Sequence, residues 1–205
     1  DFKDYAEWLD KHGIDRTHIK VLDDTLTGQA FITTDLDDNQ ITAFHPGAMG
    51  FSHQNKVSDA KGIKLGIISP DGRDGMIEHA AQFAGAGIPF IFDPGQGMPM
   101  FDGADLKTFI EQASYITVND YEWQLMKERT GWDFEDIVPL VDAVIVTKGG
   151  EGSSIYTGNG EITISAAKPD AVKDPTGCGD AYRAGLLYGL QKGLDWETTG
   201  RIASL

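Results

Sequence analysis

The stretch KLGIISPDGRDGMIEHAAQFAGAGIPFIFDP, residues 64–94, decides the fold class of this chain. Residues 64–70 form a short, mostly apolar run, which is typical of a buried strand. Residues 72–87 have a helical pattern that ends in glycine, and residues 88–94 form a second apolar run. A strand, a helix and a strand in this order predict a βαβ unit with two parallel strands.

The same alternation continues toward the C-terminus. We expect strands at 114–119 and 142–150, and helices at 104–113 and 120–131. Short apolar strands separated by amphipathic helices indicate an α/β fold in three layers, with a mainly parallel central sheet between two layers of helices. Ligands in such sheets bind beyond the carboxyl ends of the strands, so we expect a site at that edge.

Two segments interrupt the alternation with antiparallel signals. Residues 18–45 contain two β-prone runs, QAFITT and QITAF, joined by the polar turn DLDDN. Residues 152–166 contain two short strands around TGNG. We expect the first hairpin to be part of a small β lid on a single domain that spans residues 1–205. Because the chain opens in one helical pattern and stops inside another, we expect that domain to be incomplete.

Composition and charge exclude several classes of function. Of the 205 residues, 40% are hydrophobic and 24% are charged, which is typical of a globular protein. The net charge is −15 and the basic residues are dispersed, so we expect no nucleic-acid partner. The chain lacks an apolar run of about eighteen residues, so we expect no membrane partner. A single cysteine excludes an internal disulfide and favours the cytoplasm. The oligomeric state stays open, with a homodimer as one alternative.

The segment DPTGCGDAYRAG, residues 174–185, is the strongest candidate for a site. DPTG predicts a turn, after which Gly177 and Gly179 allow backbone conformations or close approaches that a Cβ would block. A helix is predicted to begin at about Gly179 to Asp180, so the backbone N–H groups of residues 177–180 point outward at the positive end of the helix dipole. Such an arrangement is typical of an anion-binding site.

Two side chains in this segment each allow two interpretations. Cys178 is predicted to be a small buried residue rather than a nucleophile, because no histidine lies near it in the sequence. Asp180 is either the N-cap of the helix or a general base that accepts the proton of a hydroxyl attacking a phosphoryl group, and this motif alone favours the cap. The helix face predicted to pack against the sheet holds Ala181, Ala184, Gly185 and Tyr188.

Three motifs, each after a predicted strand, resemble those of the ribokinase-like (PfkB-type) carbohydrate kinases. DPTGCGDAYRAG is similar to the D-T-T-G-A-G-D-A-F signature of that family. VNDYEWQLM contains an N-x-x-E pattern at Asn119 and Glu122, and VTKGGEGS resembles the nucleotide-binding turn of the family. Within the family these motifs, together with DPGQ at 93–96 and AFHPGAM at 43–49, most resemble bacterial adenosine kinases.

The resemblance implies a phosphoryl transfer from ATP that depends on Mg²⁺. It implies that Asp180 removes the proton of the primary hydroxyl of the acceptor. It also implies that the backbone N–H groups of Gly177, Cys178 and Gly179 neutralise the charge that grows on the transferred phosphoryl group.

The other two motifs imply residues that bind the metal and the nucleotide. Asn119 and Glu122 would hold Mg²⁺ through water, although the same pair on its own is typical of a helix cap followed by a first-turn glutamate. Asn119, Thr147, Gly149 and Gly152 would contact the bound nucleotide. The alternative for VTKGGEGS is a plain turn into the hairpin that follows.

The acceptor pocket is expected to use aromatic side chains of the first hairpin. Phe31 and Phe44 lie on its two predicted strands, where their faces could close over an adenine. The alternative is that both rings form the small hydrophobic core of the hairpin itself. Gln96, in the loop after the strand at 88–92, offers amide donors and acceptors to a ribose or purine, or is a solvated loop residue.

Three functions stay open. The first is phosphorylation of the 5′-hydroxyl of a nucleoside, with adenosine preferred and AMP as product, as in purine salvage. The second is a kinase for a free sugar or another riboside, which shares every catalytic motif. The aromatic residues of the hairpin and Gln96 favour the nucleoside. The third is a catalytically silent nucleotide-binding relative, and the joint presence of Asp180, Asn119 and Glu122 counts against it.

Overall fold

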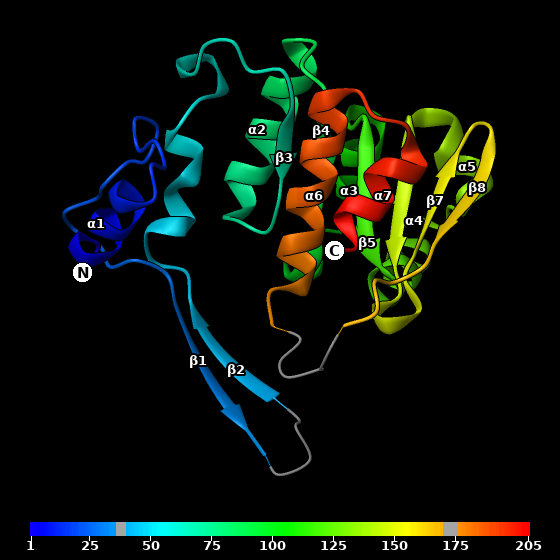
Figure 1. Ribbon diagram of the computed structural model, residues 1–205. Coiled ribbons are helices and arrows are strands. Elements are labelled where there is room, and N and C mark those ends of the chain that lie inside the picture. Colours follow the sequence, from blue (N-terminus) through cyan, green and yellow to red (C-terminus); the bar gives the residue numbers. More distant parts are fainter. Residues whose placement is uncertain (36–39, 170–175) are drawn as a thin grey trace. The chain divides into compact units, whose positions relative to one another are not determined.

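The computed structural model describes residues 1–35, 40–169 and 176–205 (Figure 1). The chain divides into two compact units, which we name the sheet unit (63–70 and 83–205) and the hairpin unit (1–62 and 71–82). The extent of one domain over residues 1–205, with 18–45 as part of a lid, stays a prediction. Among the helices of the described residues, none has the length and apolar character needed to cross a membrane.

Within the described residues, the sheet unit is built on six strands that follow one another across the sheet in chain order. They are β3 (Gly66–Ile68), β4 (Phe90–Phe92), β5 (Tyr115–Asn119), β6 (Ala143–Thr147), β7 (Ser153–Thr157) and β8 (Gly160–Ile164). Strands β3 to β6 are parallel, and β7 and β8 continue the sheet as an antiparallel hairpin. The mainly parallel sheet that the sequence predicts is therefore confirmed, as is the hairpin at 152–166.

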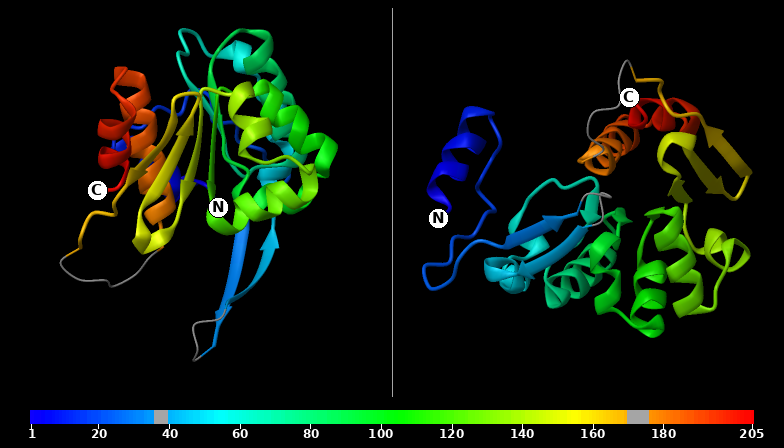
Figure 2. Two further views of the ribbon diagram at one scale, coloured as in Figure 1. Left: turned by 90° about the vertical axis from the view of Figure 1, so that its right-hand side faces the viewer. Right: turned by 90° about the horizontal axis from the view of Figure 1, so that it is seen from below.

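Helices cover both faces of this sheet (Figure 2). One layer contains α3 (Gly103–Gln112), α4 (Asp120–Thr130) and α5 (Phe134–Ile137), and the other contains α6 (Cys178–Lys192) and α7 (Trp196–Ala203). The fully buried strand β4 serves both layers because its side chains alternate between the faces. Phe92 stacks on Phe109 of α3 with ring centroids 4.5 Å apart, whereas Ile91 belongs to the cluster that contains Tyr182 and Leu186 of α6. The three-layer α/β fold is confirmed.

Side-chain caps start the helices of the first layer. In each case an Asp or Asn accepts a backbone N–H of the first turn, and the acidic residue three positions later accepts the N–H of the cap residue. The pairs are Asp102 with Asp105 for α3, Asn119 with Glu122 for α4, and Asp133 with Asp136 for α5. The Asn119 pair belongs to a predicted site motif, so the start of α4 is fixed where that motif lies.

The packing of α6 differs from the prediction. Its buried residues are Tyr182, Leu186 and Gly189, whereas Ala181, Ala184 and Tyr188 are exposed. The large apolar side chains decide which face turns inward, and the small residues serve a different contact. A Cβ on Gly185 would lie 2.5 Å from Cα of Ala203, so Gly185 allows α7, rather than the sheet, to approach closely.

The hairpin unit contains α1 (Lys3–Lys11), β1 (Gln29–Thr34), β2 (Gln40–His45) and residues 73–82 of α2 (Arg73–Gly85). The described residues also include 3-10 segments at Gly47–Gln54, Val57–Asp59, Gly95–Met100, Val138–Leu140 and Gly149–Glu151, the last three in the sheet unit. The two strands pair in antiparallel, as the sequence predicts. Residues 36–39 of the predicted turn DLDDN lie outside the described residues.

The register of this hairpin separates its two aromatic residues. Phe31 pairs with Ala43, and Ala30 pairs with Phe44. Because residues that face each other across a ladder share a side of the sheet, Phe31 and Phe44 point to opposite sides. The two rings are 62% and 53% exposed. The alternative that both rings form one hairpin core is therefore wrong, and the contact of either ring with an acceptor stays a prediction.

The contact between α6 and α7 leads to a stability prediction. Gly185→Ala should lower the free energy of unfolding by about 1–3 kcal/mol, because the added methyl group meets the backbone of Ala203. A glycine replaced by alanine inside a helix otherwise gains about 0.5–1 kcal/mol. Gly85→Ala is the matched control, since Gly85 lies in α2 with no atom within 4 Å of the added Cβ. Urea unfolding measures both, and a stabilised Gly185→Ala variant would show that α7 does not pack there.

Candidate active site

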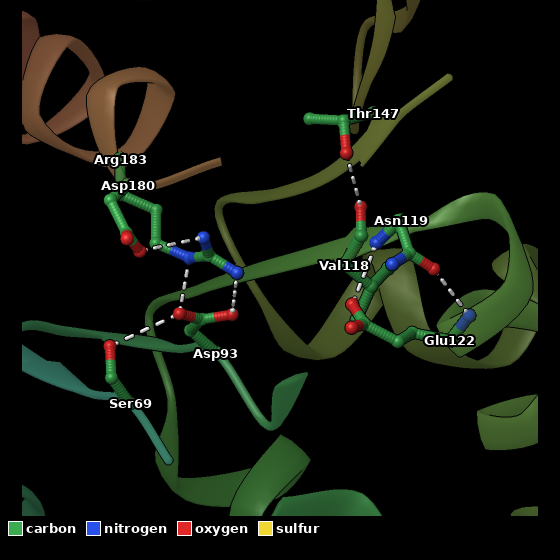
Figure 3. A network of polar contacts seen from close by, with 8 residues as sticks. All are labelled: Ser69, Asp93, Val118, Asn119, Glu122, Thr147, Asp180 and Arg183. Atoms are coloured by element: carbon green, nitrogen blue, oxygen red, sulfur yellow. Dashed lines mark hydrogen bonds and ion pairs between the residues drawn. The ribbon is translucent and has the colours of Figure 1, made fainter. Parts of the chain in front are cut away.

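The carboxyl ends of three parallel strands bring the predicted motifs together. Asp93 follows β4, Asn119 is the last residue of β5, and Thr147 is the last residue of β6. Asn119 and Thr147 are paired across the ladder, and the Thr147 hydroxyl donates to the carbonyl oxygen of Val118 at 3.5 Å. Figure 3 shows these residues beside Glu122. The N-x-x-E motif and the nucleotide-turn motif therefore lie at one edge of the sheet, which we name the site edge.

Asn119 and Glu122 form the cap of α4. The backbone N–H of Glu122 donates to Oδ1 of Asn119 at 2.7 Å, and the backbone N–H of Asn119 donates to Oε2 of Glu122 at 2.8 Å. The helix-cap interpretation of this pair is thus correct as a description of its local geometry. Glu122 is half-buried, however, rather than solvated, and its Oε1 lies outside this pair of hydrogen bonds.

The environment of Glu122 disfavours its negative charge. Burial raises the pKa of this carboxyl, the nearby charge of Asp93 raises it further, and the N–H of Asn119 opposes the shift. A desolvated carboxylate with one oxygen outside its hydrogen bonds fits a cation that approaches through water. Because Asn119 Oδ1 already accepts a hydrogen bond, a hydrated Mg²⁺ suits this pair better than two direct ligands. Within the described residues, no group of three or more His, Cys, Asp or Glu side chains could hold a metal.

The nucleotide-turn motif contains two different kinds of glycine. Gly152 is buried with a φ of 95°, and a Cβ there would lie 2.0 Å from the carbonyl oxygen of Ile164, so this glycine serves the packing of the hairpin. Gly149 has a φ of 55° and no atom within 4 Å of such a Cβ. Its backbone is therefore open to a ligand. The roles of Thr147, Gly149 and Gly152 toward a nucleotide stay predictions.

Helix α6 begins one residue earlier than predicted, and this changes the place of Asp180. Gly177 is the N-cap, with a left-handed φ of 83°, and Cys178 is the first helical residue. Asp180 is therefore the third residue of the helix, and the prediction that it is the N-cap is wrong. Its side chain is 88% exposed, and Nη1 of Arg183 lies 3.4 Å from its Oδ1. Cys178 is also exposed, so the prediction that it is a small buried residue is wrong as well.

The start of α6 has the character of the predicted anion-binding segment. Residues 177–180 are exposed, and a Cβ on Gly177 would meet no atom within 4 Å. The first backbone N–H groups of a helix lack partners inside the helix, so an anion can accept from them. Asp174 and Pro175 of the predicted DPTG turn lie outside the described residues.

Sequence reasoning missed an ion pair that joins α6 to β4. Asp93 is 1% exposed and its Oδ1 accepts a hydrogen bond from Nη2 of Arg183 at 2.9 Å, while Nε of Arg183 forms an ion pair with Oδ2 (Figure 3). The Ser69 hydroxyl donates to Oδ2 at 3.1 Å. Burial raises the pKa of Asp93, and Arg183 opposes that shift. A charged residue directly after the wholly apolar strand FIF was the available signal, because that position is the carboxyl end of a buried strand.

Gln96 lies in the segment that follows Asp93. It is exposed in the 3-10 segment Gly95–Met100, between the buried residues Gly95 and Gly97. Two hydrogen bonds from Nη1 of Arg129 to the carbonyl oxygens of Met98 and Phe101 hold the end of this segment. The loop position predicted for Gln96 is confirmed, and its contact with an acceptor stays a prediction. Phe31 and Phe44 belong to the hairpin unit, and their roles also stay predictions.

This fold and the motifs at the site edge define a kinase of the ribokinase type, and the comparisons agree. The model of the pfkB family of carbohydrate kinases matches residues 1–205, so the chain belongs to that family.

Among curated proteins, the chain is 33% identical to a nucleoside kinase of Methanocaldococcus jannaschii, with 100% of this chain and 68% of that protein covered. Among solved structures, it is similar to the nucleoside kinase of Burkholderia thailandensis in complex with inosine, at 53% identity and a TM-score of 0.96. The match covers 100% of this chain and 67% of that one. The complex of the same kinase described as ADP-inosine matches with a TM-score of 0.95 at 53% identity, covering 100% of this chain and 64% of that one. The chain thus spans about two thirds of the length of these relatives.

The half-buried carboxylate of Glu122 gives a prediction about metal dependence. Glu122→Gln in the full-length protein should raise the Mg²⁺ concentration needed for half-maximal rate, or lower the rate, by about 10–100-fold. The control is Glu128→Gln, the same change at an exposed position of α4. Initial rates against free Mg²⁺ at saturating ATP measure the effect. Superimposed curves for Glu122→Gln and wild type would remove Glu122 from the metal site.

A pH series on the metal-free protein provides an independent check. Because the pKa of Glu122 is raised on folding, its ionisation costs stability as the pH rises from the unfolded pKa through the folded pKa. Glu122→Gln removes that cost. The unfolding midpoint of the variant relative to wild type should therefore rise with pH across this window, whereas a constant difference would contradict the raised pKa.

Proposed function

We propose that the full-length protein transfers the γ-phosphoryl group of ATP to the 5′-hydroxyl of a nucleoside, with adenosine as the preferred acceptor. Membership of the pfkB family supports phosphoryl transfer. The similarity to nucleoside kinases over the whole of this chain supports a nucleoside acceptor. The observation that carries the proposal is the position of Asp180, an exposed carboxylate in the first turn of a helix whose N–H groups face outward.

In the proposed reaction Asp180 acts as the general base. Its carboxylate accepts the proton of the 5′-hydroxyl while that oxygen forms a bond to the γ-phosphorus and the bond from this phosphorus to the β,γ-bridging oxygen breaks. ADP leaves with the electrons of the broken bond. The N–H groups of Gly177, Cys178 and Gly179 donate to the oxygens of the transferred group, where negative charge develops. These donors are backbone groups fixed by the helix, so they need little reorganisation during the reaction.

The residues at the site edge complete the proposed nucleotide site. Mg²⁺, held through water by Glu122 beside Asn119, would supply positive charge to the phosphates of ATP. Thr147 and the open backbone at Gly149 would receive the nucleotide. The carboxylate of Glu122 explains the need for a cation, because its negative charge would otherwise repel the phosphates of ATP.

Kinases for a free sugar or another riboside share each of these catalytic groups. We prefer a nucleoside because the β1–β2 hairpin carries exposed aromatic rings and Gln96 is exposed after β4. A silent nucleotide-binding relative would not need a carboxylate that is both exposed and outside the cap of its helix.

Asp180→Asn tests the proposed base. The rate constant kcat should fall by about a hundredfold to ten-thousandfold, whereas KM for ATP should change little, because asparagine keeps the shape and loses the base. The urea midpoint should stay close to wild type, since the side chain is 88% exposed. Asp74→Asn is the matched control, an exposed aspartate in the first turn of α2. A variant with normal kcat and lowered stability would make Asp180 a structural residue only.

The hairpin register gives a second kinetic prediction. Because Phe31 and Phe44 point to opposite sides, only one of them can stack on a given acceptor base. One alanine variant should raise KM for the nucleoside, because it loses about 1–3 kcal/mol of stacking free energy. The other variant should leave KM unchanged. Steady-state kinetics of Phe31→Ala and Phe44→Ala decide it, and equal effects of both changes would contradict a single stacking face.

A further inference from the structure

The guanidinium group of Arg183 connects two carboxylates from different parts of the sheet unit. Two of its nitrogens face Asp93, which is 1% exposed at the end of β4. The third nitrogen, Nη1, lies 3.4 Å from Oδ1 of Asp180, three residues earlier in the first turn of α6 (Figure 3). Arg183 itself is largely buried, with 25% of its side chain exposed. The planar group is thereby held by one carboxylate in an orientation that faces the other.

Gly179 leaves the space that this arrangement needs. A Cβ built on Gly179 would lie 2.7 Å from Nη1 of Arg183 and 3.7 Å from its Cζ. The guanidinium group therefore lies against the backbone of the first turn of α6, where any larger residue would displace it. Gly179 therefore has two roles. It exposes its backbone N–H, and it leaves the space in which Arg183 reaches between its own helix and Asp93.

The ion pair also fixes the start of the helix. The N-cap residue Gly177 has no side chain to accept an N–H of the first turn. The contact of Arg183 with the buried Asp93 instead ties this end of α6 to the carboxyl end of β4. Ser69, after β3, holds Oδ2 of Asp93 from the other side. A chain of contacts from two strand ends therefore ends at the carboxylate of Asp180.

We propose that Arg183, anchored by Asp93, is a positioning residue that orients the Asp180 carboxylate and the first turn of α6 for phosphoryl transfer. The inference rests on the proposed function, in which Asp180 is the base. Arg183 does not take the proton. It limits the orientations of an otherwise solvent-exposed side chain, and small errors in the orientation of a catalytic group are enough to cost about a hundredfold in rate.

The first test is kinetic, in the full-length protein. Arg183→Met should lower kcat by about 10–100-fold and leave KM for ATP nearly unchanged, because the substitution disturbs the base and not the nucleotide site. Arg183→Lys should recover only part of kcat, since an ammonium group cannot contact both carboxylates as a planar fork does. Arg201→Met is the matched control, an exposed helix arginine that forms an ion pair with Glu197. Wild-type kcat in Arg183→Met would overturn the proposal.

A double variant separates positioning from stability. Removing Arg183 alone leaves the buried charge of Asp93 without its partner, which destabilises the fold. Adding Asp93→Asn to Arg183→Met removes that charge and should restore the urea midpoint toward wild type. It should not restore kcat, because nothing then holds Asp180. If kcat recovered together with stability, the pair would be structural only and the proposal would be wrong.

Hydrogen exchange tests the same geometry without any reaction. In Arg183→Met with Asp93→Asn, the backbone amides of residues 181–183, the first that bond to carbonyls of α6 (Ala181 to Gly177 at 2.9 Å), should exchange faster than in wild type, while those near the end of α6 at residues 186–192 should not change. Unchanged exchange at residues 181–183 would overturn the proposal whatever the acceptor is. If wild type fails to phosphorylate any nucleoside or sugar, the proposed function fails, and the exchange result still decides whether Arg183 fixes this turn.

Discussion

The parallel pairing of β4, β5 and β6 is the constraint on which the candidate site depends. Parallel strands end at the same edge of the sheet, so residues that follow them become neighbours although they are far apart in the chain. Asn119 and Thr147, the last residues of β5 and β6, are paired across the ladder for this reason. Asp93, at the end of β4, then provides the buried charge to which α6 is attached through Arg183. Asp180 is placed by that helix and not by a strand.

Several residues at this edge have a structural and a proposed catalytic role at once. The cap of α4 uses one oxygen of Glu122 and leaves the other outside that pair of hydrogen bonds. Asp93 also combines two roles. A buried ion pair adds little net stability, because desolvation offsets the attraction between the charges. The ion pair contributes a fixed geometry, since two nitrogens of a planar group face one immobile carboxylate.

The parts of the structure that could be predicted from the sequence are those decided by local patterns. The apolar runs predict the parallel strands, TGNG predicts the β7–β8 turn, and the polar residues at the end of β5 and directly after it predict the cap of α4. The predictions failed where a shift of one residue changes the direction in which a side chain points. A helix rotates by about 100° per residue, so the start of α6 at Cys178 makes Asp180 an exposed first-turn residue rather than a cap. The period of a strand is two, and the exact register separates Phe31 from Phe44. The ion pair between Asp93 and Arg183 joins residues 90 positions apart, and no local pattern encodes it.

A competition among acceptors tests whether the full-length protein phosphorylates the 5′-hydroxyl of a nucleoside, as we propose. The protein is incubated with ATP, Mg²⁺ and equal concentrations of adenosine, inosine, ribose and fructose, and the phosphorylated products are identified by mass spectrometry. A parallel reaction contains 5′-deoxyadenosine alone. We expect nucleoside 5′-monophosphates as the main products and no phosphorylation of the 5′-deoxy compound. Sugar phosphates as the main products, or a phosphorylated 5′-deoxynucleoside, would contradict it.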